Sequence, residues 1–329
     1  MNNGKKSFTL LELIIVIVVL ALISVGTFKA IQMLYQRYSE VNTITKFSIL
    51  SQTSLSQIGT LMYHRVPITA IGYSPSDGDF KQLADVDDSK YKIFEFINEA
   101  FNAKKHAYED NVSKGYSSFI DLDASNKDTL TLVTKDFNIT DINDTINHIF
   151  NTSQNLNKTV GIIFAGGLDE GDSGSDYNDS FGWHGHKHKK VFLIDKFKQV
   201  GQDANLTMNS DISGNKIYAK FYLSASAWGL ARGADIDKNS NCLKNLNIND
   251  NTLLLFYNYR PWNNETFCAD PHQDNTEQKA GGVSILAQNI TAFKISETIN
   301  HIEIKLQFSK PLFRGSDKNI TITKQKVIF

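Results

Sequence analysis

The chain has 329 residues, of which 41% are hydrophobic and 21% are charged, and its formal net charge is -1 at pH 7. This near-neutral balance excludes a chain-wide basic field that would neutralise phosphates, so whole-chain charge does not indicate nucleic-acid binding. An aromatic content of 11% fits a folded chain with a real core and argues against wholesale disorder.

The N-terminal residues 1–7 form a short basic segment that contains Lys5 and Lys6. An apolar run follows over residues 8–28, with Glu12 as its one charged residue. A helix of about 20 residues spans the hydrocarbon core of a bilayer, and positive charge before it stays cytoplasmic. The run is too long for an ordinary secretory signal and lacks a small-residue cleavage site at its far end. Residues 8–28 are therefore predicted to form a transmembrane helix.

Glu12 needs an explanation, because a carboxylate at the centre of a membrane helix costs about 2.5–3.5 kcal/mol, and less near the interface. A plain signal anchor does not account for it. We therefore expect this side chain to have a partner or a function.

Residues 5–17 read Lys-Lys-Ser-Phe-Thr-Leu-Leu-Glu-Leu-Ile-Ile-Val-Ile and resemble the precursors of the type IV pilin superfamily. The resemblance implies that a prepilin peptidase cleaves between Ser7 and Phe8 and that Phe8 is then N-methylated. It also implies that Glu12 pairs with the N-terminal amine of a neighbouring subunit during assembly. This pairing is physically sensible, because each charge in apolar surroundings is costly without the other.

Two residues depart from the family pattern. Ser7 precedes the cleavage point where the family usually has glycine, which keeps the small size and makes slower processing an expectation to test. Lys29 stands near the position where many major pilin helices contain a proline, so we expect a straighter helix in this chain.

Beyond the apolar run, hydrophobic residues continue at three- and four-residue steps up to Leu61. They predict an amphipathic continuation of the helix over residues 29–62, with one face on a sheet and another against neighbouring subunits. Pro67 and the glycine- and proline-containing run 72–78 are expected to end it. Residues 63–329 are predicted to form a periplasmic or extracellular head.

The head contains both helical and strand-like patterns. Apolar residues at helical spacing predict a short second helix over 91–107. Short runs rich in β-branched and aromatic residues predict strands at 118–122, 129–134, 159–164, 190–194, 216–223 and 253–259. Alternating segments at the C-terminus predict an antiparallel meander of three strands at 283–295, 301–308 and 319–329.

These elements predict an α+β fold in which a long N-terminal helix packs on an antiparallel sheet. A large loop-rich insertion is expected from about residue 110 to about residue 280. The segment 287–293, Ala-Gln-Asn-Ile-Thr-Ala-Phe, is similar to a segment that leads into the closing strands of J-type minor pseudopilins and related minor pilins. This resemblance implies a minor filament subunit.

Cys242 and Cys268 are the only cysteines in the sequence. In an exported domain, an even number of cysteines predicts a disulfide. The bridge would close a loop of about 25 residues and contribute on the order of 3 kcal/mol in the chain-entropy model. Two unpaired buried thiols are the alternative.

Three histidines at alternate positions, His184, His186 and His188, are candidates for a transition-metal site. On a strand, alternate residues point to one face, so the three imidazoles could ligate zinc or nickel. The lysines between and after them oppose a cation, and an exposed polar loop is the plainer interpretation.

The glycine-rich segment 166–179 is acidic and carries Asp169, Asp172 and Asp176. Carboxylate oxygens on such a loop could bind calcium, although the spacing is not that of an EF-hand. A solvated loop is the plainer interpretation. The acidic loop and the neighbouring histidine–lysine segment could instead pair with each other as charged turns.

No catalytic motif is recognisable, because the sequence contains no Gly-x-Ser-x-Gly elbow, His-Glu-x-x-His, phosphate loop or dinucleotide fingerprint. We expect no enzymatic activity and no cofactor other than the metals considered above.

The predicted function is that of a minor pilin or pseudopilin held in the inner membrane with a periplasmic head. Its expected partners are other pilins, prepilin peptidase and the inner-membrane assembly platform. Together they would build a short filament for type II secretion, type IV pili or DNA uptake, with the bulky head at the tip. The rival hypothesis is a membrane-anchored periplasmic binding or metal-handling domain that uses a pilin-type anchor.

Overall fold

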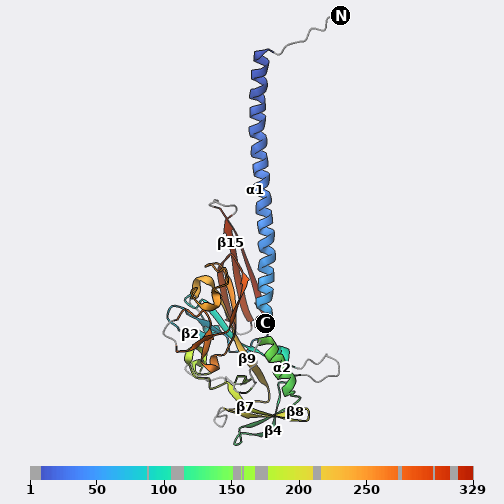
Figure 1. The fold of residues 1–329 in the computed structure, drawn as a ribbon, viewed down its shortest axis with the longest axis vertical. Coiled ribbons are helices and arrows are strands. Elements are labelled where there is room, and N and C mark those ends of the chain that lie inside the picture. Colours follow the sequence, from blue (N-terminus) through green and yellow to red (C-terminus); the bar gives the residue numbers. More distant parts are fainter. Residues whose placement is uncertain are drawn as a thin grey trace.

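The computed structural model describes residues 9–86, 89–104, 115–150, 157, 159–166, 177–209, 216–272, 276–298, 301–311 and 318–328. A long helix, α1, projects from a β-rich head (Figure 1). The predicted α+β fold, with a long N-terminal helix and a large antiparallel sheet, is confirmed.

The helix α1 (Leu10–Tyr63) is continuous over 54 residues and about 80 Å long at 1.5 Å per residue. Its first buried residue is Phe47. From there, buried side chains recur at helical spacing: Phe47, Ser51, Ser54, Leu55, Ile58, Gly59 and Met62. The helix ends before Pro67, because the Val66 N–H donates to the Ile97 carbonyl at 2.8 Å and thereby joins the sheet.

The large sheet has 11 strands within the described residues, and its strands pair antiparallel. Its strands are β1 (Ile71–Tyr73), β2 (Phe80–Gln82), β3 (Ile93–Glu99), β4 (Ile120–Asn126), β5 (Thr131–Thr134), β6 (Gly161–Phe164), β7 (Phe192–Val200), β8 (Asp203–Met208), β9 (Phe221–Arg232), β10 (Leu253–Tyr259) and β13 (Gly282–Ala287). Their order is β2-β1-β3-β9-β6-β7-β8-β5-β4, and β10 pairs with both β9 and β13. The strand β9 therefore holds the sheet together, since it pairs with β3, β6 and β10.

Each of the six short runs predicted as strands overlaps an observed strand. The region expected to be a loop-rich insertion supplies β4 to β10, and β9 continues to Arg232, well beyond the predicted run. This region is therefore part of the central sheet.

The predicted helix over 91–107 is wrong, because the strand β3 runs through it over Ile93–Glu99. This strand has a core on both faces: Ile93 and Ile97 pack into one hydrophobic cluster, and Phe94 and Phe96 pack into another. A strand that is buried on both faces loses the alternation of polar and apolar residues. Its apolar residues then match helical spacing by coincidence.

A second sheet of three antiparallel strands lies along α1 (Figure 1). Its strands are β14 (Ile290–Thr298), β15 (His301–Pro311) and β16 (Asn319–Ile328). The predicted C-terminal meander is thus confirmed, but its first strand, predicted over 283–295, is two strands. The backbone turns at Asn289, with φ of 64°, so that β13 joins the large sheet and β14 the second sheet.

The remaining elements are short. They are α2 (Ile139–Phe150), η1 (Leu83–Asp85), η2 (Phe101–Ala103), η3 (Trp183–Gly185), η4 (Gly233–Asp235), η5 (Asn241–Leu243), η6 (Pro261–Asn263), and the parallel pair β11 (Glu265–Phe267) and β12 (Gln278–Ala280). The helix α2 was not predicted. It is capped by Asn138, whose Oδ1 accepts from the Asp141 N–H at 3.2 Å.

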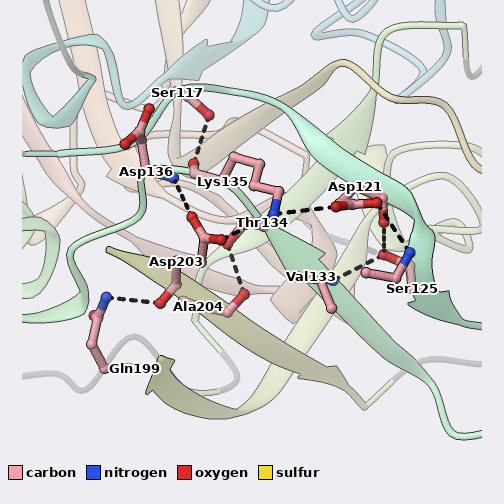
Figure 2. Close-up of polar contacts among 11 residues, drawn as sticks. Ser117, Asp121, Ser125, Val133, Thr134, Lys135, Asp136, Gln199, Asp203 and Ala204 are labelled. Carbon is pink, nitrogen blue, oxygen red and sulfur yellow. Dashed lines mark hydrogen bonds and ion pairs between the residues drawn. The ribbon is translucent and has the colours of Figure 1, made fainter. Parts of the chain in front are cut away.

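A polar network ties β4, β5 and β8 together at the end of the head farthest from the start of α1 (Figures 1 and 2). Lys135 Nζ lies 3.2 Å from an Asp121 oxygen and 3.0 Å from an Asp203 oxygen. Asp203 also accepts from the Asp136 backbone N–H at 3.1 Å. These contacts are exposed and therefore position loops without forming a core.

Candidate functional site

The helix α1 begins with a capping box formed by Thr9 and Glu12. The Thr9 hydroxyl oxygen accepts from the Glu12 N–H at 3.3 Å. Glu12 Oε2 accepts from the Thr9 N–H at 3.0 Å and from the Thr9 hydroxyl at 2.9 Å. These bonds satisfy N–H groups at the start of the helix that would otherwise lack partners.

Both hydrogen bonds from Thr9 reach the same carboxylate oxygen, so Glu12 Oε1 stays available to a donor from outside the described chain. Ser7 and Phe8 lie outside the described residues. Cleavage between them and N-methylation of Phe8 therefore stay predictions, as does the pairing of Glu12 with a neighbouring subunit.

The first part of α1 exposes its apolar surface. Every large hydrophobic side chain from Leu10 to Leu34 is at least 45% exposed. Within the described residues, α1 is the one helix long and apolar enough to cross a membrane, and the head buries none of its apolar window. This surface is compatible with a single membrane anchor, because lipid removes it from water.

The three histidines predicted as metal ligands have separate surroundings. His184 is buried in η3, and its Nε2 lies 2.8 Å from Glu95 Oε1. His186 is exposed, with Nδ1 3.7 Å from Asp179 Oδ1. His188 Nδ1 lies 3.2 Å from a backbone carbonyl. The segment is a turn that precedes β7, so the alternation expected of a strand does not bring the imidazoles together.

Among the described residues, no group of three or more His, Cys, Asp and Glu side chains is placed to hold a metal ion. Asp169, Asp172 and Asp176 lie outside the described residues, so the calcium prediction stays a prediction. Asp179 lies at the end of the same loop and pairs with Lys189 at 3.1 Å. At this position the acidic loop and the histidine–lysine segment do pair as charged turns.

A buried polar cluster surrounds His184. Glu95 contacts His184 Nε2 through one oxygen and accepts from the Tyr259 hydroxyl at 2.6 Å through the other. Asp270 accepts from the Tyr73 hydroxyl at 2.9 Å, and its other oxygen lies 3.7 Å from His184 Nδ1. The imidazole stacks on the Tyr73 ring with centroids 3.8 Å apart and 6° between the planes. Glu95 and Asp270 are both fully buried.

The backbone around His184 is shaped to bring this side chain inward. His184 has φ of 47°, in the left-handed region, between Gly182 at 84° and Gly185 at 78°. A non-glycine residue in a sparsely populated conformation costs about 1–3 kcal/mol and persists only where the surroundings fix it. The bond to Glu95 and the stack on Tyr73 supply that fixation.

Electrostatics favour a charged imidazole at this position. Burial opposes the protonation of His184, but the carboxylates of Glu95, Asp270 and Glu277 outweigh it and raise its pKa above 6.5. Burial, reinforced by the charge of Glu95, raises the pKa of Tyr259 well above 10. The tyrosine hydroxyl therefore keeps its proton and donates it to Glu95.

The sequence interpretation missed the acidic members of this cluster, because the fold brings Glu95 of β3 together with Asp270 and Glu277 of the distant segment between β11 and β12. One signal was present: Glu95 interrupts the apolar run Ile-Phe-Glu-Phe-Ile. A carboxylate inside a buried strand requires a partner. The predicted helix over 91–107 hid this signal.

The predicted disulfide between Cys242 and Cys268 is present, with Cα atoms 6.3 Å apart. It ties η5 to the turn that follows β11 and ends two residues before Asp270. The bridge therefore restrains the backbone that carries one of the buried acids.

Comparison with known proteins identifies the N-terminal segment. Residues 2–28 match a family model described as the prokaryotic N-terminal methylation motif. The match includes Glu12 and the apolar part of α1, and it does not extend into the head. No curated protein and no solved structure matches the chain. With this motif and its long apolar N-terminal helix, the chain fits a type IV pilin-like protein.

Proposed function

We propose that this chain is a minor pilin or pseudopilin subunit that prepilin peptidase processes and that assembles into a pseudopilus or type IV pilus. The observation that carries the proposal is the exposed apolar part of α1, which holds a single carboxylate, Glu12, near its start. An anchor alone needs apolar length, whereas a charge in the apolar segment needs a partner. A neighbouring subunit with a free N-terminal amine would supply that partner.

The arrangement of the head supports the same function. The second part of α1 packs on β16 and β15, so the exposed part is rigidly continuous with the folded domain. A force on the membrane part of α1 would therefore move the head with it. Because the head is large, we place the subunit at the filament tip, where it has fewer neighbours than along the shaft. Protein secretion and DNA uptake are the processes that such filaments would serve.

N-terminal mass spectrometry of the membrane-extracted protein tests the processing step. We expect a mature chain that begins with N-methylated Phe8. An intact Met1, or a cut at another position, would contradict processing by prepilin peptidase and leave the membrane-anchored binding domain as the better explanation. The Ser7→Gly variant sharpens the experiment, because it should speed cleavage if the residue before the cut limits the rate.

The assembly step is tested by Glu12→Ala. Incorporation into the filament fraction should fall to background, while the head remains folded, because Glu12 has no contact with the head. Glu40→Ala is the matched control, since it removes another exposed glutamate from the same helix outside the apolar run. Equal incorporation of the Glu12 and Glu40 variants would refute the assembly role.

A further inference from the structure

Glu277 is a buried acid whose carboxylate accepts no hydrogen bond within the described residues. Its side chain is 8% exposed, and among the described residues neither carboxylate oxygen accepts a hydrogen bond. It lies directly before β12 and lines a cavity of about 410 Å³ beside η3. An ionised carboxylate in such surroundings is strongly unfavourable unless a positive charge or a proton compensates it.

The other two acids of the cluster already have donors. Glu95 contacts His184 Nε2 at 2.8 Å and accepts from a tyrosine hydroxyl. Asp270 accepts from a tyrosine hydroxyl, from Thr266 at 2.8 Å and from a backbone N–H at 3.0 Å. Three carboxylates therefore surround one imidazole, and negative charge exceeds positive charge even when His184 is protonated.

Two lysines, one in the cavity lining and one that contacts the Asp270 backbone, do not pair with Glu277 in the described structure. Lys279 Nζ donates to the Asp270 carbonyl at 2.6 Å. Lys187 lines the cavity and is exposed. Within the described residues, the charge of His184 is the one positive charge that acts on Glu277, and Glu95 and Asp270 share it, so an external cation would complete the balance.

We infer that this cavity binds an organic cation, with an ammonium or guanidinium group that donates to the Glu277 carboxylate. The Tyr73 ring and the imidazoles of His186 and His272 line the same cavity and would pack against the alkyl stem of the ligand. A Cβ at Gly185 would lie 3.3 Å from Glu277 Oε1, so glycine leaves the carboxylate accessible to a donor.

The groups that line the cavity favour an organic cation over a metal ion. Calcium takes 6 to 8 oxygen ligands and structural zinc about four ligands of nitrogen or sulfur. Here Glu277 is the one acid of the cluster whose oxygens are free, and the described residues contain no metal-ligating group of three. An ammonium group needs a carboxylate and a few further acceptors or aromatic faces, which this cavity provides.

The cavity volume suits a small group. About 410 Å³ is near the lower end of the range of small-molecule sites, roughly 300–1,000 Å³. The ammonium or guanidinium group can belong to a free small molecule or to a lysine or arginine side chain of another protein. The inference does not depend on filament assembly, because every residue of the cavity belongs to the head.

Isothermal titration calorimetry on the full-length chain in a non-ionic detergent tests the inference. The probes are n-butylammonium, the methylamide of N-acetyl-lysine and a lysine-rich peptide. We expect saturable binding of the amines and none of the methylamide of N-acetyl-norleucine, which has the same shape without the charge. Tighter binding of the peptide than of n-butylammonium would indicate a protein side chain, and the reverse would indicate a free amine.

Two matched variants locate the binding. Glu277→Gln should weaken amine binding about 10- to 100-fold, because a buried charged hydrogen bond is lost. Glu99→Gln should leave it unchanged, since Glu99 is equally buried but pairs with Lys104 at 2.8 Å. Without ligand, the Glu277→Gln variant should keep the cooperative thermal unfolding of the parent chain. This second measurement shows that loss of binding is not loss of folding.

Three results would overturn the inference. They are no saturable binding of any amine, equal binding by the Glu277→Gln variant, and binding of calcium or zinc, but not of amines, that depends on Glu277.

Discussion

The two parts of α1 share one helix and have opposite surroundings. From residue 10 to residue 46, no position is buried, although the first half of this stretch is the most apolar segment of the chain. From Phe47 to Met62, seven residues are buried against the head. Burial therefore does not follow apolar content along this helix.

The difference shows which contacts complete the fold of a single chain. Soluble monomers rarely expose contiguous apolar patches larger than a few hundred Å². The apolar surface of the first part of α1 is continuous and is compatible with a membrane anchor, in which lipid covers it; in the proposed filament, neighbouring subunits would cover it. The head needs neither, because its own strands cover the second part. Changes in the first part should therefore affect anchoring and assembly, and changes in the head should affect folding.

The largest expected effect on folding comes from Ile58→Ala. Ile58 is fully buried between α1 and the sheets, and its replacement should lower the free energy of unfolding by about 3 kcal/mol through lost burial and a cavity. The matched variant Ile17→Ala removes the same atoms from an exposed position and should change it by less than about 0.5 kcal/mol. Urea unfolding in detergent, followed by tryptophan fluorescence, measures both.

Tryptophan fluorescence follows the unfolding of the head, because all three tryptophans of the sequence lie there: Trp183, Trp228 and Trp262. Equal destabilisation by the two isoleucine variants would contradict the conclusion that the two parts of α1 differ in their contribution to folding. It would show that the first part also contributes to the folding of the head.

The disulfide should have the next largest effect. Replacing Cys242 and Cys268 together by serine should lower the free energy of unfolding by about 2–4 kcal/mol, since the unfolded chain loses its constraint. Incorporation of the surviving folded protein through Glu12 should be unchanged. Addition of a reductant should destabilise the parent chain and leave the double variant unaffected, and a parent chain insensitive to reductant would contradict the prediction.

Sequence reasoning located the elements whose pattern is local. The length of α1, the disulfide and the C-terminal meander follow from apolar periodicity, cysteine number and alternation. Each of these features is encoded by neighbouring residues or by a pair that has no other partner. The family match at residues 2–28 belongs to the same group, because its motif is contiguous.

Features that depend on tertiary contacts were not predictable in this way. The strand β3 resembles a helix in sequence because both of its faces are buried. The turn between β13 and β14 falls at two consecutive polar residues, Gln288 and Asn289, and this break is too short to separate two strands by pattern alone. The cluster around His184 joins residues from β1, β3, η3 and the segment after β11, so no local spacing could indicate it.

Alkaline pH should lower the stability of the folded head, because His184 then loses its proton. Its pKa is raised in the folded state, so its contribution to stability is complete below pH 6.5 and is lost as pH rises through the raised value. The groups that face it are the carboxylates of Glu95, Asp270 and Glu277 and the ring of Tyr73. The urea midpoint should therefore fall as pH increases above 6.5. His184→Gln should remove this dependence and His186→Gln should keep it.

The same pH series also tests the first part of α1. It contains no histidine, so its side chains should not contribute to the fall of the urea midpoint over this pH range. A pH-dependent midpoint in the His184→Gln variant that matches the parent chain would assign the effect to another group.

The smallest effect is expected for Lys135→Met in the network of Figure 2. Lys135 bridges Asp121 and Asp203 at the far end of the head, but the pairs are exposed and water screens them. Asp203 keeps its bond from the Asp136 N–H when the lysine is replaced. The urea midpoint should fall slightly at low ionic strength and coincide with that of the parent chain in about 1 M salt, where screening acts within about 3 Å. A loss that persists in high salt would mean that the alkyl stem of Lys135 packs in this lobe, so that the lobe depends on the burial that otherwise distinguishes the head from the first part of α1.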